Sequence, residues 1–345
     1  MRVLVAWNND SSLKSGLSEI EMIGEDEVAE SAAEIATQLS EKHDCKLLPV
    51  GKSLEEAIRE IQSFEPAIVF NLCEGLLGRT DWESHFTLLL EMLDIPFTGC
   101  TSVPLALCLD KGLIKRLLLA DGIRTPAGFA FGPHDSDSQH AGSFEKLGGP
   151  AFVKPARSDG GIGVDRDSFV TNWPEALERC RFIHERYGQD AVVEQFIDGR
   201  ELNLATFCSG DGFTMLPPGE IFFDDSLQPR ERVVGFRAKW AAGSVEDKAT
   251  VSGRASLDPD SLAGIESAAR AASQLIGLDG YARFDFRVNA MGDLFLVDVN
   301  PNPDIGPGSG FRKALEAAGL PFSEFLNQLM MAGLSVNTTT AGRDR

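Results

Sequence analysis

The sequence predicts an α/β protein that begins with a parallel sheet and continues with antiparallel strands. Apolar segments typical of buried strands alternate with amphipathic segments typical of helices over roughly the first hundred residues, and this alternation indicates βαβ units. Farther along, short apolar segments are joined by glycine-containing turns, which indicates antiparallel pairs. A chain of 345 residues also exceeds one ordinary core, so two or three domains are expected.

Residues 1–103 are expected to form the first domain. Its strand-like segments are 2–7, 46–50 and 67–72. Its segments with helical periodicity are 24–42, 53–64 and 82–94. Ser53 and Glu56 have the spacing of a capping box, which supports the start of the second helix.

The rest of the chain is expected to form two further units, residues 104–194 and 195–334. Helical character begins the first of these and ends before Pro126. The later elements are strands near 150–156, 168–172 and 191–199, a helix at 173–188, a helix at 261–278, and strands at 281–289 and 293–300. The polar segment 134–150 is interpreted as a surface loop. The tail, residues 335–345, is rich in threonine and is expected to be disordered.

Composition excludes several classes of protein. The formal net charge of -20 disfavours nucleic-acid and anionic-membrane partners, which prefer basic surfaces, whereas a phosphate ligand needs only a few placed lysines and a metal ion. The six cysteines show no C-x-x-C spacing, so reduced thiols in a cytoplasmic protein are expected. The N-terminus does not have the pattern of a signal peptide, and no apolar run has the length of a membrane span.

Two carboxylates stand inside apolar strands near the C-terminal end. Asp285 lies in the first strand of a hairpin, and Asp298 with Asn300 lies in the second. Because side chains alternate along a strand, residues 298 and 300 share a face, and the partner strand can bring Asp285 to the same face. Such oxygen donors suit Mg²⁺ held together with phosphate oxygens. Arg283, two residues before Asp285, suits an oxyanion. The alternative is a structural turn with paired surface carboxylates.

A second group of residues combines a lysine with a glycine-rich segment. Lys154 follows apolar residues, and "SDGGIG" (158–163) follows it closely. Glycines allow backbone N–H groups to approach phosphates, and the lysine supplies charge. The alternative is a plain hairpin with an extended surface lysine. Lys111, Glu194 and Glu201 are weak signals when each is taken alone. The first strand lacks G-x-G-x-x-G, so a nicotinamide cofactor is not expected.

The order of these segments resembles the ATP-grasp superfamily, and in particular its D-alanine–D-alanine ligase branch. The resemblance covers about residues 67 to 310. The motifs that carry it are "LLLEMLDIPFTG" followed by "LDK", then "FVKPA", "VVEQFIDGREL", "PPGEI", "ARFDFRV" and "LFLVDVNPNP".

The resemblance implies a parallel N-terminal α/β domain followed by two α+β subdomains that clamp ATP. The implied reaction is ADP-forming ligation of a carboxylate to an amine through an acylphosphate. The residues implied to bind nucleotide are Lys111, Lys154, Ser158, Gly160, Gly161, Gly163, Glu194, Gln195, Phe196, Ile197 and Glu201. Asp285, Asp298 and Asn300 are implied to hold Mg²⁺, with two ions expected and Mn²⁺ as a substitute. Arg283 and Lys239 are implied to stabilise the oxyanion and the phosphates.

The departures from the family pattern fall around the substrates. Glu74 stands at a histidine position, Trp240 at a tyrosine position and Asp304 at a glycine position. Glu25 aligns with the family's amine-binding acid, and Ser309 matches the serine that binds the acceptor carboxylate. We therefore expect amino-acid or amine substrates other than two D-alanines. Acidic Glu74 and Asp304 favour an additional cationic group by charge.

One further departure lies in the metal set, where Asp298 replaces a glutamate of equivalent chemistry. Two alternatives remain open from the sequence. The same acylphosphate serves a tailoring or cyclising enzyme equally well, and a nucleotide-binding protein without catalysis is the other alternative. The family resemblance also allows a homodimer.

Overall fold

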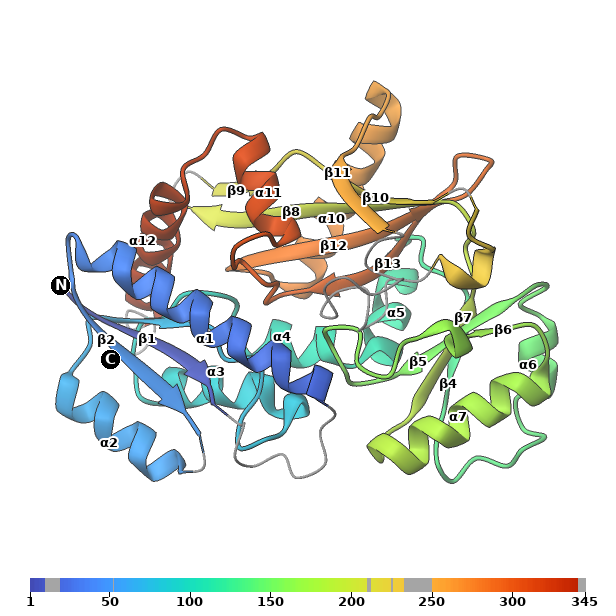
Figure 1. The fold of residues 1–345 in the computed structure, drawn as a ribbon, viewed down its shortest axis with the longest axis horizontal. Helices are drawn as coiled ribbons and strands as arrows, with labels where there is room; N and C mark the ends of the chain where they lie inside the picture. Colours follow the sequence, from blue (N-terminus) through green and yellow to red (C-terminus); the bar gives the residue numbers. More distant parts are fainter. Residues whose placement is uncertain (10–18, 52, 210–211, 225, 233–249, 341–345) are drawn as a thin grey trace.

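The computed structural model describes residues 1–9, 19–51, 53–209, 212–224, 226–232 and 250–340, and it contains three sheets (Figure 1). In the view of Figure 1 the first sheet lies at the left, the third along the top and the second at the lower right. This α/β architecture, with one parallel and two antiparallel sheets, confirms the predicted fold class.

The first sheet is parallel, with strand order β2-β1-β3. Its strands are β1 (Arg2–Asn8), β2 (Asp44–Val50) and β3 (Ile68–Asn71). The accompanying helices are α1 (Glu19–Ser40), α2 (Leu54–Phe64), the 3₁₀ turn η1 (Thr80–Trp82), α3 (Glu83–Met92), α4 (Ser102–Leu109) and α5 (Lys111–Ala120). The hydroxyl of Ser53 accepts a hydrogen bond from the backbone N–H of Glu56 and caps α2, as the sequence predicts.

The second sheet is antiparallel, with strand order β4-β7-β5-β6. Its strands are β4 (Gly128–Phe131), β5 (Ala151–Pro155), β6 (Phe169–Val170) and β7 (Ala191–Gln195). Its helices are α6 (Ala141–Glu145), the 3₁₀ turn η2 (Arg166–Ser168) and α7 (Trp173–Tyr187). Asn172 caps the start of α7 and Gly188, in the left-handed conformation, ends it.

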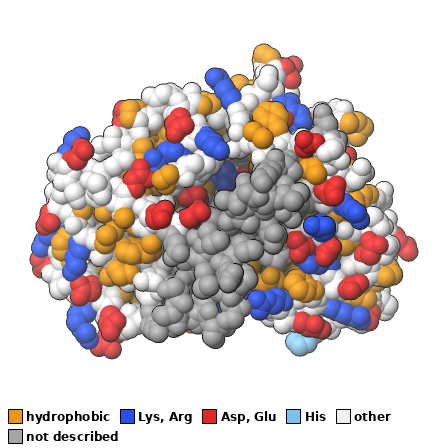
Figure 2. Space-filling model, in the orientation of Figure 1, with side chains coloured by type: hydrophobic (Ala, Val, Ile, Leu, Met, Phe, Trp, Pro, Cys, Tyr) orange, Lys and Arg blue, Asp and Glu red, His pale blue; other side chains and the backbone are white. Residues whose placement is uncertain are grey.

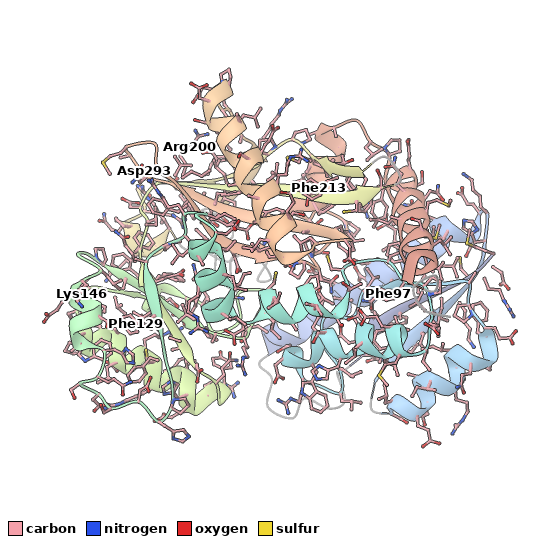
Figure 3. The ribbon with its side chains drawn as sticks, turned by 180° about the vertical axis from the view of Figure 1, so that it is seen from behind. Phe97, Phe129, Lys146, Arg200, Phe213 and Asp293 are labelled. Carbon is pink, nitrogen blue, oxygen red and sulfur yellow. The ribbon has the colours of Figure 1, made fainter. Side chains whose placement is uncertain are left out.

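The third sheet is antiparallel, with the path β11-β10-β8-β12-β13 and β9 paired to β8. Its strands are β8 (Arg200–Ser209), β9 (Gly212–Met215), β10 (Gly219–Phe223), β11 (Thr250–Arg254), β12 (Tyr281–Val288) and β13 (Leu294–Asn300). Its helices are the 3₁₀ turn η3 (Pro229–Glu231), α10 (Pro259–Ile276), α11 (Gly310–Ala317) and α12 (Phe322–Thr340). Seen from behind, α10 covers this sheet (Figure 3).

Three local expectations differ from the structure. The helix predicted from residue 104 is broken at Asp110, because the Asp110 carboxylate accepts the backbone N–H of Leu113 and starts α5 anew. The predicted surface loop contains the short helix α6. The expected disorder after residue 334 is wrong for residues 335–340, because α12 continues to Thr340.

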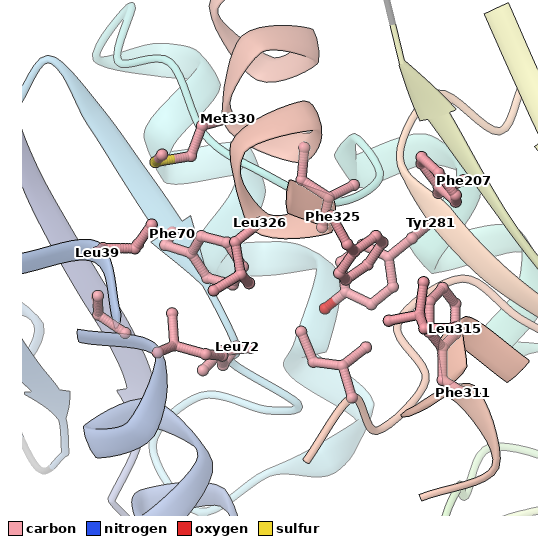
Figure 4. Packing of buried hydrophobic residues seen from close by; sticks show 14 of the residues in the cluster. Leu39, Phe70, Leu72, Phe207, Tyr281, Phe311, Leu315, Phe325, Leu326 and Met330 are labelled. Carbon is pink, nitrogen blue, oxygen red and sulfur yellow. The ribbon is translucent and has the colours of Figure 1, made fainter. Parts of the chain in front are cut away.

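One apolar core joins the first sheet to the third. Phe70 of β3 and Phe207 of β8 belong to the same buried cluster, together with Phe311 of α11 and Phe325 of α12 (Figure 4). Figure 3 shows Phe97 beside α12, where a Cβ added to Gly333 would lie 2.3 Å from the Phe97 carbonyl oxygen. The C-terminal helix therefore docks on the N-terminal sheet and fixes its position relative to the third sheet.

No helix in the described part of the chain has the length and apolar character needed to span a membrane.

We expect Phe325→Ala to lower the free energy of unfolding by about 3–5 kcal/mol, because it leaves a cavity in this shared core. Phe325 is fully buried, with its ring centroid 5.2 Å from those of both Phe207 and Phe311. Urea denaturation measures the change. Met331→Ala, on an exposed position of the same helix, is the control and should change the value little. Equal effects of the two substitutions would contradict the shared-core interpretation.

Candidate active site

The predicted carboxylates lie together on one face of the third sheet. In the register of β12 and β13, Asp285 is directly opposite Asp298, and Arg283 is directly opposite Asn300. Ala282, Phe284 and Phe286, which alternate with these residues on β12, are buried on the opposite face, toward α10. A bulge follows Asp285 in the pairing, and such bulges commonly redirect side chains beside functional sites. The alternation read from the sequence is therefore confirmed.

Arg283 neutralises one of these carboxylates. Its Nε and Nη2 donate to the two oxygens of Asp285 over 2.7 and 2.8 Å. The Asp285 charge raises the pKa of Arg283 above its usual value, and burial only partly opposes this rise. Two carboxylates that face each other across a strand pair repel. Cations on both sides are therefore needed to hold them in place.

Lys111 supplies a second cation, at the first residue of α5. Its buried Nζ lies 3.1 Å from Asp159 Oδ1 and 3.8 Å from Asp298 Oδ2. Burial alone would lower the pKa of Lys111, but Asp159 and Asp298 outweigh it and raise that pKa. The Lys111 backbone N–H also donates to the carbonyl of Ala156 over 3.0 Å. This lysine thereby connects the sheet face to the glycine-rich loop.

The glycine-rich loop adopts a backbone conformation that requires glycine at three positions. Gly160, Gly161 and Gly163 have φ values of 65°, 83° and 72°, in the left-handed region. A Cβ on Gly163 would also lie 2.6 Å from Pro155 Cγ. The buried Ser158 hydroxyl accepts a hydrogen bond from Gln189. The loop thus follows β5 with its base fixed and its backbone close to Lys111.

A buried charge cluster lies behind the loop. The Glu194 carboxylate is 3.1 Å from Lys154 Nζ and 2.6 Å from Lys115 Nζ. Burial and the Lys154 charge lower the pKa of Lys115, although Glu194 opposes this. Burial alone would raise the pKa of Glu194, yet the two lysines lower it. Sequence reasoning missed Lys115, although its position one helical turn after Lys111 was a usable signal.

The remaining predicted nucleotide residues line the edge where the second and third sheets meet. The backbone N–H of Gln195 donates to Ala127 and that of Phe196 to Pro150, while Ile197 is buried. Glu201 on β8 is paired with Arg287 over 2.5 Å. Its carboxylate therefore already has a partner, whereas the family resemblance implied contact with the nucleotide.

A small pocket forms where α1 meets the loop after β13. It is lined by Val28, Ser31, Leu72, Glu74, Tyr281, Asn302, Pro303, Asp304 and Ile305. Glu74 and Asp304, two residues predicted to face substrate, are therefore brought together. In Figure 2, acidic side chains lie beside the grey centre of the visible face. A basic side chain lies deeper, in the hollow just above that grey area.

The other residues predicted to lie around the substrates are in different parts of the chain, and the structure describes only some of them. Ser309 caps α11, where its hydroxyl oxygen accepts the backbone N–H of Arg312 over 3.1 Å. Glu25 belongs to α1, but its side chain lies outside the described part. Lys239 and Trp240 lie outside the described residues altogether. Glu27, which sequence reasoning missed, lies near enough to Asp304 for that charge to affect its pKa.

A buried hydrogen-bond network forms the floor of the pocket. The Tyr281 hydroxyl donates to Asn302 Oδ1 over 2.8 Å, and Asn302 Nδ2 donates to Glu83 Oε1 over 2.8 Å. Figure 4 shows the hydroxyl of Tyr281 directed toward the side where Leu72 lies. Burial, and then the Asp159 charge, raise the pKa of Glu83 well above its usual value. Sequence reasoning missed Asn302 and Glu83 as site residues.

The donor set fits a hard divalent cation that shares its coordination with phosphate oxygens. Asp285, Asp298 and Asn300 offer carboxylate and amide oxygens on one face. Asn300 Oδ1 accepts the backbone N–H of Asn302 over 2.8 Å and keeps a second lone pair. Within the described ranges, no three His, Cys, Asp or Glu side chains form a complete cage of their own. Asp285, Asp298 and Asn300 would therefore fill only part of the coordination shell of such a cation.

Comparison with solved structures identifies the fold. The ATP complex of D-alanine–D-alanine ligase from Bacillus anthracis matches with a TM-score of 0.76, 20% identity and 99% coverage of both chains. The VanG D-Ala:D-Ser ligase from Enterococcus faecalis matches with a TM-score of 0.71, 19% identity, 96% coverage of this chain and 99% of that one. The fold is the ATP-grasp fold.

Sequence comparison then gives the family. The model of the D-ala D-ala ligase C-terminus matches residues 117–331. D-alanine–D-alanine ligase A from Mesorhizobium japonicum is 30% identical over 300 residues, which is 84% of this chain and 78% of the relative. Ligase B from Clostridium perfringens is 25% identical over 261 residues, with 76% and 80% covered. The chain belongs to the D-alanine–D-alanine ligase family of ATP-dependent ligases.

We expect Glu83→Gln to change how stability depends on pH. Because the folded protein raises the pKa of Glu83, the native state binds a proton more tightly than the unfolded state. That contribution is full at low pH and is lost as pH rises above the unfolded value of about 4.3. A glutamine at position 83 can accept the hydrogen bond from Asn302 and does not ionise, so it avoids the cost of a buried charge at high pH. The stability of the variant relative to the wild type, measured by urea denaturation, should therefore increase from pH 5 to pH 8.

Glu185→Gln, an exposed position of α7, is the control for removing one carboxylate and should follow the wild-type pH dependence. A constant difference between Glu83→Gln and the wild type across that range would contradict the raised pKa.

Proposed function

We propose that this protein is an ADP-forming carboxylate–amine ligase that joins amino acids or related small molecules through an acylphosphate, with substrates other than two D-alanines. In the first step a substrate carboxylate oxygen attacks the γ-phosphorus of ATP and ADP leaves. In the second, an amine nitrogen attacks the acyl carbon, loses a proton, and phosphate leaves. The amide product, ADP and phosphate account for all the atoms.

The observation that carries this proposal is the charge arrangement on the third sheet. Asp285 and Asp298 face each other, flanked by Arg283 and Lys111. A purely structural site gains little from opposed carboxylates that require two cations. A site for phosphoryl transfer uses both signs, because carboxylates hold Mg²⁺ and the basic side chains stabilise oxygen atoms that gain charge.

Each group has a defined task in the proposed reaction. Lys111 and Lys154, from α5 and β5, would bind phosphate oxygens, and the loop containing Gly160, Gly161 and Gly163 would cover them with its backbone N–H groups. Arg283 would stabilise the oxyanion formed when the amine attacks. Mg²⁺ on Asp285, Asp298 and Asn300, with a second ion expected, would neutralise phosphate charge.

The remaining roles follow from the family resemblance. Lys239 is proposed to contact phosphates, Ser309 the acceptor carboxylate, and residues 194–197 the adenine. Glu25, Glu74, Trp240 and Asp304 are proposed to surround the substrates. The acidic pocket supports substrates that differ from those of the named relatives, since Asp304 introduces a charge where the family pattern has glycine. We further propose a cytoplasmic enzyme that can form a homodimer.

The direct test is release of ADP and phosphate from ATP and Mg²⁺ in the presence of panels of D- and L-amino acids and amines. We expect release that depends on the amino acid, with a product whose mass equals the two substrates minus water. A product that lost water within one molecule would indicate the cyclising alternative. Stabilisation by ATP without substrate-dependent release across the panels would count against a ligase.

We expect Asp298→Asn to reduce turnover by on the order of 100-fold or more, because it removes a charge that holds Mg²⁺ and phosphate in place. Steady-state ADP release measures the loss, and thermal denaturation without ATP should show that the variant still folds. Asp293→Asn, at the exposed turn of the same hairpin, is the control and should retain turnover. Unchanged turnover in Asp298→Asn would contradict the metal assignment.

A further inference from the structure

The small pocket beside α1 lies next to the proposed reaction centre. Tyr281 lines it, and Arg283 follows two residues later on the same face of β12. Alternate residues of a strand are about 7 Å apart. A substrate whose carboxylate lies at Arg283 would therefore extend its other end into this pocket.

The pocket carries more negative charge than the α-ammonium group of one amino acid requires. Asp304 lines it, and its described partner is the backbone N–H of Gly306, at 2.7 Å. Glu27 lies near Asp304 on α1. Loss of hydration raises the pKa of both carboxyls, and the Asp304 charge adds to the rise in Glu27. Among the described residues, Glu74 and Asp304 place two carboxylates in the pocket wall, and this geometry suits a ligand that carries a cation.

Within the described ranges, the basic side chains near Asp304 are paired with other carboxylates. Arg312 forms two hydrogen bonds with Glu34, over 3.1 and 3.0 Å. Arg283 forms its two with Asp285. Both arginines act on Asp304 only at longer range and oppose the rise in its pKa. Among the ion pairs of the described residues, none includes Asp304 or Glu27.

An independent feature indicates that the pocket binds a polar group. Ser31 is 6% exposed and lines the pocket, and within the described part of the chain its hydroxyl has no hydrogen-bond partner. A Cβ on Gly306 would lie 2.3 Å from Ser31 Oγ, so only glycine leaves this space open. The Ser31 hydroxyl is not among the fully buried unpaired atoms, so it opens onto the pocket, where a ligand N–H could donate a hydrogen bond to it.

The other walls suit a short hydrocarbon chain. Val28, Leu72 and Ile305 contribute apolar side chains, and the Tyr281 ring is buried beside them. An aliphatic chain that ends in an ammonium group matches this combination of apolar walls, a hydroxyl and carboxylates.

We propose that this pocket binds the side-chain ammonium of a diamino acid, so that the preferred substrate of the ligase is an α,ω-diamino acid. One carboxylate pairs with the α-ammonium group, as for any amino acid, and the second pairs with the ω-ammonium group. This inference rests on the ligase function proposed above, but it can be tested by binding alone.

The experiment compares ornithine with norvaline, which has the same carbon chain without the terminal amine, each in its D and L forms. Isothermal titration of the full chain with ATP analogue and Mg²⁺ measures affinity without turnover. We expect one ornithine enantiomer to bind at least about tenfold more tightly than the matching norvaline, a difference of about 1.4 kcal/mol. Lysine with norleucine and 2,4-diaminobutyrate with 2-aminobutyrate test the chain length in the same way.

Asp304→Asn should bring the ratio of ornithine affinity to norvaline affinity close to one, whereas Glu185→Gln should keep that ratio. If Asp304→Asn does not fold, Asp304→Ser removes the same charge and provides the same comparison. Equal binding of diamino and neutral partners in all three pairs, or no binding of any diamino acid, would overturn the proposal. Binding with the expected preference but without ADP release would support the pocket and refute the ligase function.

Discussion

The opposition of two carboxylates on neighbouring strands is the constraint on which the rest of this site depends. Asp285 and Asp298 face each other in a direct cross-strand pair, which is unfavourable unless cations lie between or beside them. The structure surrounds them with Arg283 from the same strand and Lys111 from a helix in another part of the chain. The pair therefore requires the first residue of α5 to be held against β13.

Holding α5 there also positions the second sheet. Lys111 contacts Asp159 of the glycine-rich loop and donates its backbone N–H to Ala156 at the end of β5. One turn later, Lys115 reaches both Glu194 of β7 and the carbonyl of Val297. Two lysines on one helix thus connect the two antiparallel sheets. Because the Lys111 ammonium contacts the carboxylates of Asp159 and Asp298, a phosphate ligand could compete for it without disturbing the apolar cores.

Local periodicity explains what the sequence could predict. The shared face of Asp298 and Asn300 follows from strand alternation alone, and the cap of α2 follows from Ser53 and its neighbours. The partners of buried charges do not follow from periodicity. Asn302 donates to Glu83 across 219 positions of sequence, and only the folded chain brings the two together. The helical continuation after residue 334 was missed because its composition is polar, although the preceding turns of α12 are anchored by buried Leu326, Leu329 and Met330.

The choice between two acids on α1, Glu25 and Glu27, illustrates the same limit. A shift of two residues turns a helical side chain by about 200°, so a small offset in alignment decides between Glu25 and Glu27. The structure places Glu27 near Asp304. That position is fixed by the shared core, in which Ile35 and Leu39 of the same helix are buried. The proposed substrate residues on α1 would thus be held by the N-terminal part of the chain, whereas those proposed to bind phosphate are held by α5 and the sheets. Because Asp304 lies in a loop after β13 while Lys111 lies on α5, a change of charge at position 304 would alter the pocket beside α1 and leave the contacts of Lys111 in place.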